Sequence, residues 1–137
     1  MSNKNKKEKT YEELKDIMNS SIGTSRYYRV NPFIRNFLIT DGVKYFAEKV
    51  EAYWLCDVAA SYIPRLMKID DYFFIVSLSV EKNKDIEGIF KIFHEIDYEL
   101  RVLVDQKIPY VDLPTGKYEF YFIREEENFI LLCKSEY

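Results

Sequence analysis

The hydrophobic periodicity of this chain changes at Asp70 and Asp71. Before that point, apolar residues recur at intervals of three and four between Val43 and Tyr62, which is the period of an amphipathic helix. After it, β-branched and aromatic residues dominate and begin to alternate, a pattern typical of strands. Helices followed by strands predict an α+β domain, with N-terminal helices packed on one face of a C-terminal antiparallel sheet of about four to five strands.

The helical part is predicted to contain two helical stretches. Thr10 and Glu13 have the spacing of a capping box, so a short helix should run from there to about Asn19. The stretch 43–62 is predicted to form one helix, or two joined near Glu51 and Ala52, capped by Thr40 or Asp41. Pro64 should end it and push Ile63 out of helical geometry. The segments between these helices are predicted to be an extended or short strand over 26–32, stopped by Pro32, and a short apolar element over 33–39.

The second half is predicted to form strands. Residues 86–96 are ambiguous, because their apolar positions also fit a helical stripe, and a strand is favoured since Gly88 would weaken a helix. The acidic turn 125–128 should join the last two strands into a hairpin. The predicted strands are 72–80, 88–93, 100–108, 117–124 and 129–133.

Length and composition fit one domain. The chain has 137 residues, 47% of them hydrophobic, enough for a core without crosslinks. We expect a flexible basic tail over 1–9 and a single domain over 10–137, with a helical part 10–66 and a sheet part 70–137. No signal peptide or membrane-spanning stretch is apparent, so Cys56 and Cys133 are expected to be reduced thiols in the cytoplasm.

The charge is unevenly distributed. The formal net charge is only −3, so a global nucleic-acid signature is missing. Residues 71–137 carry eight basic and fourteen acidic side chains, a net −6, and residues 1–70 carry the balancing +3. Such an acidic half could attract a basic partner, such as a nucleic-acid-binding host protein, although solubility of the sheet explains it more simply.

The residues needed for common catalytic and cofactor sites are largely missing. There is one histidine, His94, and there are only four glycines, so multi-histidine metal sites and glycine-rich phosphate loops cannot be built. His94 is expected to be merely exposed or capped. The sequence therefore assigns no catalytic, metal or cofactor residues, and no cofactor.

Two motifs suggest alternative functions, nucleic-acid binding and catalysis by carboxylates. Tyr53, Asp57 and Ser61 lie four apart and share a helix face, where Asp57 is expected to brace a neighbouring backbone group. Residues 26–29 alternate arginine and tyrosine, the interleaving used to stack bases and hold phosphates. A nucleic-acid binder that uses Arg26, Tyr27, Tyr28, Arg29, Arg35 and the lysine tail is thus an alternative. A small enzyme that uses Asp41, Asp57 or Asp112 with Ser61 or Tyr62 is a second one.

Several local motifs together resemble one family. They are 40–45 (Thr-Asp-Gly-Val-Lys-Tyr), 53–62, 106–114 and the terminal Ser135–Tyr137. Over roughly residues 22–137 the chain resembles the domain of unknown function 6876 family, small bacterial proteins often associated with phages and plasmids. The resemblance implies no known activity, cofactor or catalytic residue. Small acidic proteins of mobile elements often occlude a surface of a host protein, CRISPR effectors included.

The favoured hypothesis is therefore a non-enzymatic protein-interaction module, an anti-CRISPR-like inhibitor in its most specific form, with a protein partner and no membrane. A homodimer is a further alternative, because the terminal hairpin could leave a free sheet edge. The residues predicted to bind the partner are Tyr27, Tyr28, Asp41, Tyr53, Trp54, Asp57, Ser61, Tyr62, Tyr110, Asp112, Glu125, Glu126 and Glu127.

Overall fold

The structure is a computed structural model that describes residues 10–20, 26–82 and 86–137. The predicted basic tail 1–9 lies outside them. In these residues a seven-stranded mixed sheet has the order β1-β2-β7-β6-β3-β4-β5. Its strands are β1 (Tyr27–Tyr28), β2 (Phe37–Thr40), β3 (Phe73–Lys82), β4 (Ile86–Ile96), β5 (Glu99–Ile108), β6 (Gly116–Glu125) and β7 (Asn128–Cys133). The helices are α2 (Tyr11–Ser20), α3 (Asp41–Val50), α4 (Tyr53–Ser61), α5 (Ile63–Leu66) and the 3-10 turn η1 (Lys134–Glu136).

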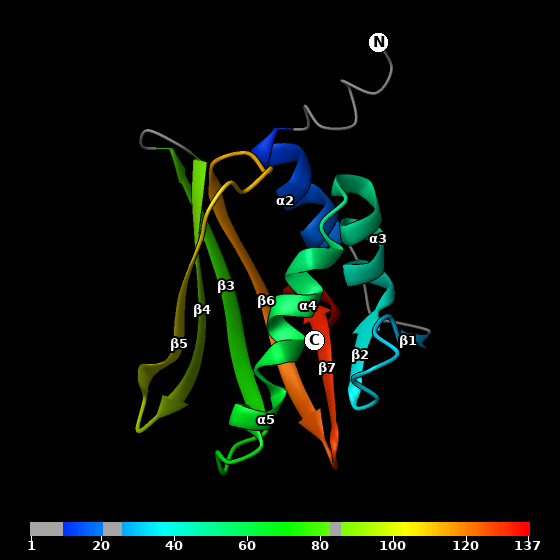
Figure 1. Cartoon of the computed structure of the whole chain (residues 1–137), viewed down its shortest axis with the longest axis vertical. Helices are drawn as coiled ribbons and strands as arrows, with labels where there is room; N and C mark the ends of the chain where they lie inside the picture. Colours follow the sequence, from blue (N-terminus) through cyan, green and yellow to red (C-terminus); the bar gives the residue numbers. More distant parts are fainter. Residues whose placement is uncertain (1–9, 21–25, 83–85) are drawn as a thin grey trace.

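The predicted α+β class is confirmed, but the sheet is mixed and mostly antiparallel instead of purely antiparallel. The sheet is larger than four to five strands, because β1 and β2 from the N-terminal half join it. β2 pairs with β7 in parallel, with Phe37 opposite Phe129. The helices are not all N-terminal either, since η1 follows β7. Figure 1 shows β2 beside β7, at the far side of the sheet from β5.

The predicted helical stretch 43–62 forms two helices, which is one of the two predicted alternatives. Glu51 adopts a left-handed conformation, with φ at 54°, and ends α3 before α4 begins at Tyr53. The prediction for Ile63 is wrong, because α5 begins at this residue and carries Pro64 in its first turn. Proline is tolerated there since the first-turn N–H has no helical acceptor. The ambiguous residues 86–96 are strand β4.

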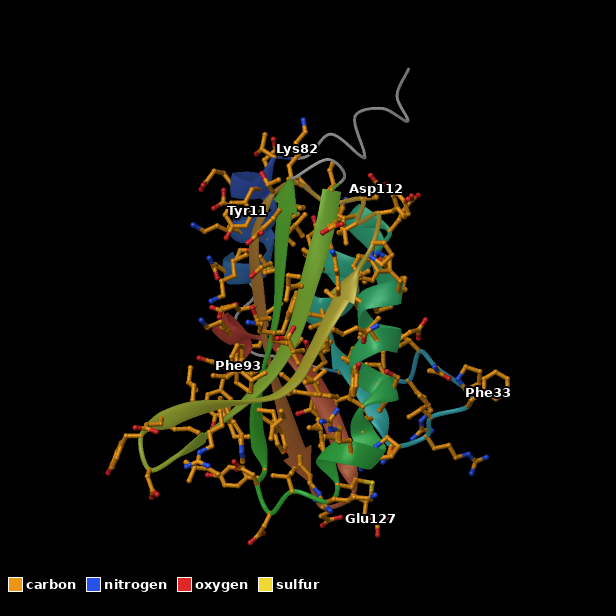
Figure 2. The ribbon with its side chains drawn as sticks, turned by 60° about the vertical axis from the view of Figure 1, so that its left-hand side comes forward. Tyr11, Phe33, Lys82, Phe93, Asp112 and Glu127 are labelled. Atoms are coloured by element: carbon orange, nitrogen blue, oxygen red, sulfur yellow. The ribbon has the colours of Figure 1, made fainter. Side chains whose placement is uncertain are left out.

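Helices cover one face of the sheet (Figures 1 and 2). Alternate residues of β3, such as Phe74 and Val76, are fully buried in a core that includes Phe46 of α3 and Ala59 of α4. The opposite face carries an apolar row that runs in register across five strands. Its members are Leu132, Tyr121, Ile75, Phe93 and Val102.

The free sheet edge predicted at the terminal hairpin is in the wrong place. That hairpin, β6–β7, is flanked by β3 and β2, and the sheet ends at β1 and β5 instead. β1 has only two residues, and the β4–β5 ladder is irregular between Ile92 and Phe93. A short edge such as β1 disfavours edge-to-edge pairing, whereas β5 is a ten-residue edge strand.

Candidate functional site

A nearly fully exposed phenylalanine stands at the tip of the loop between β1 and β2. Phe33 has 93% of its surface exposed. Figure 2 shows it projecting to the right, away from the ribbon. The sequence predicts one apolar element that contains both Phe33 and Phe37, and only Phe37 is in the core. The signal that separates the two is Asn31–Pro32, a pair that initiates turns and places the following residue at a loop tip.

The loop is held by its own hydrogen bonds. The N–H of Phe33 donates to Oδ1 of Asn31 (2.9 Å), and the Ile34 N–H donates to the Asn31 carbonyl (3.3 Å). Nδ2 of Asn31 donates to Oδ1 of Asp57 on α4 (3.4 Å). Nε of Arg29 donates to the carbonyl of Arg35 (3.1 Å), which ties the two limbs of the loop together. Phe33 is therefore presented by an ordered loop fastened to α4.

An apolar groove of ≈ 310 Å³ lies beside Phe33. Residues 33–36 form one wall, and α4 and α5 form the other. The hydrogen bond from Asn36 Nδ2 to Met67 Sδ (3.8 Å) links the two walls. The groove residues in the wall formed by α4, α5 and the residue after α5 are Ala60, Ser61, Ile63, Pro64 and Met67.

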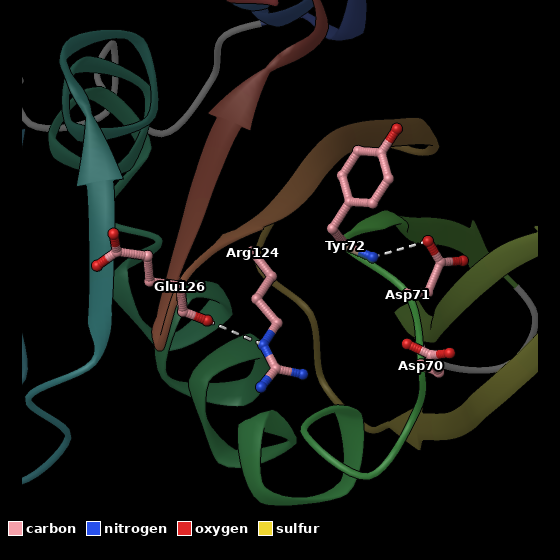
Figure 3. A pocket seen from close by; sticks show the side chains of 5 residues that line it. All are labelled: Asp70, Asp71, Tyr72, Arg124 and Glu126. Carbon is pink, nitrogen blue, oxygen red and sulfur yellow. Dashed lines mark hydrogen bonds between the residues drawn. The ribbon is translucent and has the colours of Figure 1, made fainter.

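A second hollow, of ≈ 470 Å³, lies near the same end of the molecule (Figure 3). Asp70, Asp71, Tyr72, Arg124 and Glu126 line it. Arg124 is fixed there, because Nε donates to the carbonyl of Glu126 (3.1 Å), as drawn in Figure 3. Its Nη1 also donates to the carbonyl of Met67 (3.4 Å), a groove residue, so the two hollows border each other.

The single histidine is near this second hollow. His94 is only 7% exposed, so of the two predicted alternatives, an exposed or a capped ring, the exposed one is wrong. Its Nδ1 lies 3.3 Å from Oδ2 of Asp71, and its ring stacks on Phe74. Oδ1 of Asp71 accepts hydrogen bonds from the N–H groups of Tyr72 and Phe73. Asp71 thus ties the start of β3 to β4.

Of the residues predicted on α4, Ser61 lines the groove and Asp57 contacts the loop that bears Phe33. Asp57 braces a loop, as expected, although its partner is the side chain of Asn31 instead of a backbone group. Ser61 lines the groove, and its hydroxyl donates to the carbonyl of Val58 (2.6 Å). Tyr53 points elsewhere, since its hydroxyl donates to Glu48.

The remaining predicted residues are distributed over several surfaces. Tyr62 donates to Oε1 of Gln106 (2.6 Å) and stacks on Phe90, and Trp54 packs against the core. Tyr27 and Tyr28 form β1, and a hydrogen bond with Asp41 raises the pKa of Tyr28. Tyr110 is exposed, and Asp112 lies at the opposite end of the molecule from Glu127 in Figure 2. Glu125, Glu126 and Glu127 are exposed at the β6–β7 turn. This turn is close to the groove, because the N–H of Phe129, just after it, donates to the carbonyl of the groove residue Asn36 (2.7 Å).

These positions bring no carboxylate cluster together. Asp57 contacts Asn31 of the loop, Asp41 interacts with Tyr28 at β1, and Asp112 is at the far end. Within residues 10–20, 26–82 and 86–137, no group of three or more His, Cys, Asp or Glu side chains could hold a metal ion. The buried Cys56 is a weak nucleophile, since burial raises its pKa to about 12.

The motifs at 40–45 and 135–137 meet in space. Glu136 is buried and accepts hydrogen bonds from the Thr40 hydroxyl, the Gly42 N–H and the Cys133 N–H. Ser135 donates to the carbonyl of Met18 in α2 (2.9 Å). Each of these contacts joins a different element to η1, so Thr40, Gly42, Ser135 and Glu136 of the two motifs have a structural role.

No described helix is long and apolar enough to cross a membrane. The chain matches no curated protein and no solved structure. One protein family, of unknown function, matches residues 12–137, slightly more than the resemblance suggested. Since that match covers nearly the whole sequence, the chain belongs to the DUF6876 family.

Proposed function

We propose that this chain acts by binding a protein partner through the Phe33 groove, defined as Phe33 and the residues that line the adjacent hollow. The observation that carries the proposal is an exposed aromatic ring on a loop fastened at both limbs. Water contact with a bulky apolar ring is unfavourable, and burying one contributes about 1.5–3 kcal/mol. An ordered loop loses little conformational entropy on binding, so most of that gain is available for affinity.

The surroundings of Phe33 are also those of a binding surface. Aromatic and arginine side chains are over-represented among the residues that dominate binding energies, and Phe33 lies beside Arg29 and Arg35. The groove offers a complementary cavity for an apolar side chain of the partner. Phe33 can thus insert into the surface of a partner, and the groove can accept a side chain of that partner.

In this proposal the chain binds its partner in the cytoplasm and catalyses no reaction. Its narrower form, in which the partner is a host defence protein that is inhibited by occlusion, derives from the family resemblance. Co-incubation with a panel of defence nucleases tests that form. Unimpaired target binding and cleavage across the panel would remove it, while leaving partner binding itself in place.

The binding proposal is tested by paired variants in a capture experiment. Phe33→Asp should remove at least one protein that the wild-type chain retains from an extract of its own host cells, as measured by quantitative mass spectrometry. Tyr98→Asp is the matched control, because Tyr98 is a 97% exposed aromatic residue at the β4–β5 turn. If both variants retain the same proteins as the wild type, the Phe33 groove is not the binding surface.

A nucleic-acid partner is the second candidate, because Arg29 and Arg35 are exposed next to the Phe33 ring. The acidic turn 125–127 near the groove opposes it, since a phosphate backbone would be repelled there. Titration with a fluorescent single strand at two salt concentrations distinguishes the two. Binding that requires Phe33 and falls steeply with salt would favour nucleic acid.

A further inference from the structure

We infer that the partner segment bound in the Phe33 groove carries a bulky apolar side chain with an acidic residue next to it. This inference rests on the proposed function and specifies the chemistry of its ligand. It follows from the charges around the groove, from the groove's size and from the position of the acidic turn.

The groove has a cationic rim. Arg35 belongs to its wall and is exposed, and Arg29 is fastened to the Arg35 carbonyl. In the part of the chain that the structure describes, no carboxylate lies within ion-pair distance of either guanidinium. Asp57 is the nearby carboxylate, and it accepts its hydrogen bond from Asn31. A partner carboxylate at this rim would therefore gain a bidentate arginine contact without displacing an existing pair.

The size of the groove limits the apolar part of the ligand. Its volume of ≈ 310 Å³ is at the small end of the range of about 300–1,000 Å³ for ligand pockets. Such a hollow accepts one or two side chains of a partner and does not enclose a whole helix. Ala60, Ile63 and Met67 make its floor and far wall apolar, which favours an aliphatic or aromatic side chain.

The acidic turn 125–127 limits how many negative charges the ligand can carry. Glu125, Glu126 and Glu127 lie beyond Asn36, whose carbonyl accepts from Phe129 directly after the turn. A long polyanion that extended from Arg35 toward this turn would meet three carboxylates, so a short acidic stretch fits and a nucleic-acid backbone does not. The expected ligand is thus a peptide segment with one or two carboxylates next to its apolar anchor.

The test uses a displayed library of random twelve-residue peptides, selected on the wild-type chain and counter-selected on Phe33→Asp. We expect the enriched peptides to have an Asp or Glu within two residues of a bulky apolar residue. The best peptide, labelled with fluorescein, is then titrated by anisotropy. Arg35→Glu should weaken its binding by about fivefold to tenfold, since a charge pair becomes a charge clash. Arg101→Glu is the matched control, an exposed arginine on β5 that should change the affinity by less than about twofold.

A charge swap separates recognition from a purely structural role of Arg35. A peptide with its acidic residues replaced by Lys should bind the wild type weakly and regain affinity for Arg35→Glu. Enriched peptides that need Phe33 but show no acidic preference would overturn this inference and leave the proposed function standing. A library with no Phe33-dependent peptide, or a Phe33-dependent single-stranded DNA complex, would overturn both.

Discussion

The hydroxyl of Thr40 donates a 2.6 Å hydrogen bond to the buried carboxylate of Glu136, across 96 residues of sequence. The same carboxylate accepts from the N–H of Gly42 in the first turn of α3 and from the N–H of Cys133 at the end of β7. A negative charge at a helix N-terminus is stabilised by the helix dipole. One side chain thus fixes the position of α3 against the end of β7.

Replacing Glu136 with Ala should strongly destabilise the fold. The substitution leaves one hydroxyl and two N–H donors without an acceptor in a buried site, and each such group costs about 1–3 kcal/mol. Urea unfolding should show a loss of at least about 3 kcal/mol. Glu127→Ala, at an exposed turn position, is the control and should stay within about 0.5 kcal/mol of the wild type. Equal midpoints for the two variants would contradict this role of Glu136.

Gly116→Ala should loosen α2. Gly116 has φ at 153°, and a Cβ there would lie 2.2 Å from the ring of Tyr11. That ring packs edge-on against Tyr118, and its hydroxyl donates to the carbonyl of Lys117. Strain plus displacement of the ring should cost about 1–3 kcal/mol. Hydrogen exchange should show the loss of protection first in α2, and unchanged protection there would count against the contact.

Tyr98→Gly should stabilise the protein slightly. Tyr98 follows Asp97 at the β4–β5 turn, and both residues have positive φ, 53° for Asp97 and 65° for Tyr98. Since Tyr98 is 97% exposed, its side chain contributes few contacts that the substitution would remove. Relief of this strain should exceed the entropy cost of glycine, for a net gain of up to about 1 kcal/mol. A lower thermal midpoint for Tyr98→Gly would show that the turn is not strained.

The stability of the fold should decrease in alkaline solution through its thiols. Burial raises the pKa of Cys56 to about 12, whereas a thiol in an unfolded chain has a pKa of about 8.5. The protonated thiol is thus favoured by the fold, so its contribution is complete below about pH 8.5 and is lost as the pH rises toward 12. Urea midpoints measured between pH 8 and pH 10.5 should fall for the wild type.

Two controls make this prediction specific. Cys56→Ala should be less stable at pH 8, because it opens a cavity, but its stability should depend less on pH. A thiol reagent at pH 8 should label Cys56 only after unfolding. Rapid labelling of the folded chain would contradict the burial of this residue.

The sequence predicted the elements with strong local signals and missed those determined by distant contacts. The strands near 73–82 and 117–133 and the helix over 11–20 follow from periodicity and capping. The parallel pairing of Phe37 with Phe129 has no local signal, because β2 has only four residues and its partner strand is about ninety residues away in the sequence. The left-handed Glu51 was also hard to predict, since it lacks the usual glycine.

The candidate site was predicted only in part. The four-residue spacing of Asp57 and Ser61 places them on one face of a helix, and in the structure that face is exposed. Asp57 braces the loop there, and Ser61 lines the groove. The sequence places Phe33 in one apolar element with residues 37–39, and this pattern gives no sign that it is exposed, because an apolar residue next to other apolar residues is usually buried. Its exposure depends on the turn at Asn31 and on the hydrogen bond from Asn31 to α4, and tertiary contacts of this kind leave no periodic pattern.

The pairing of β2 with β7 has a consequence for biosynthesis. A ribosome makes β2 and α3 about ninety residues before their neighbours β7 and Glu136 emerge. Until then, the apolar side of α3 and one edge of β2 have no partner, and contacts so distant in sequence form slowly. The nascent N-terminal half should therefore remain a client of chaperones until translation reaches the last strand.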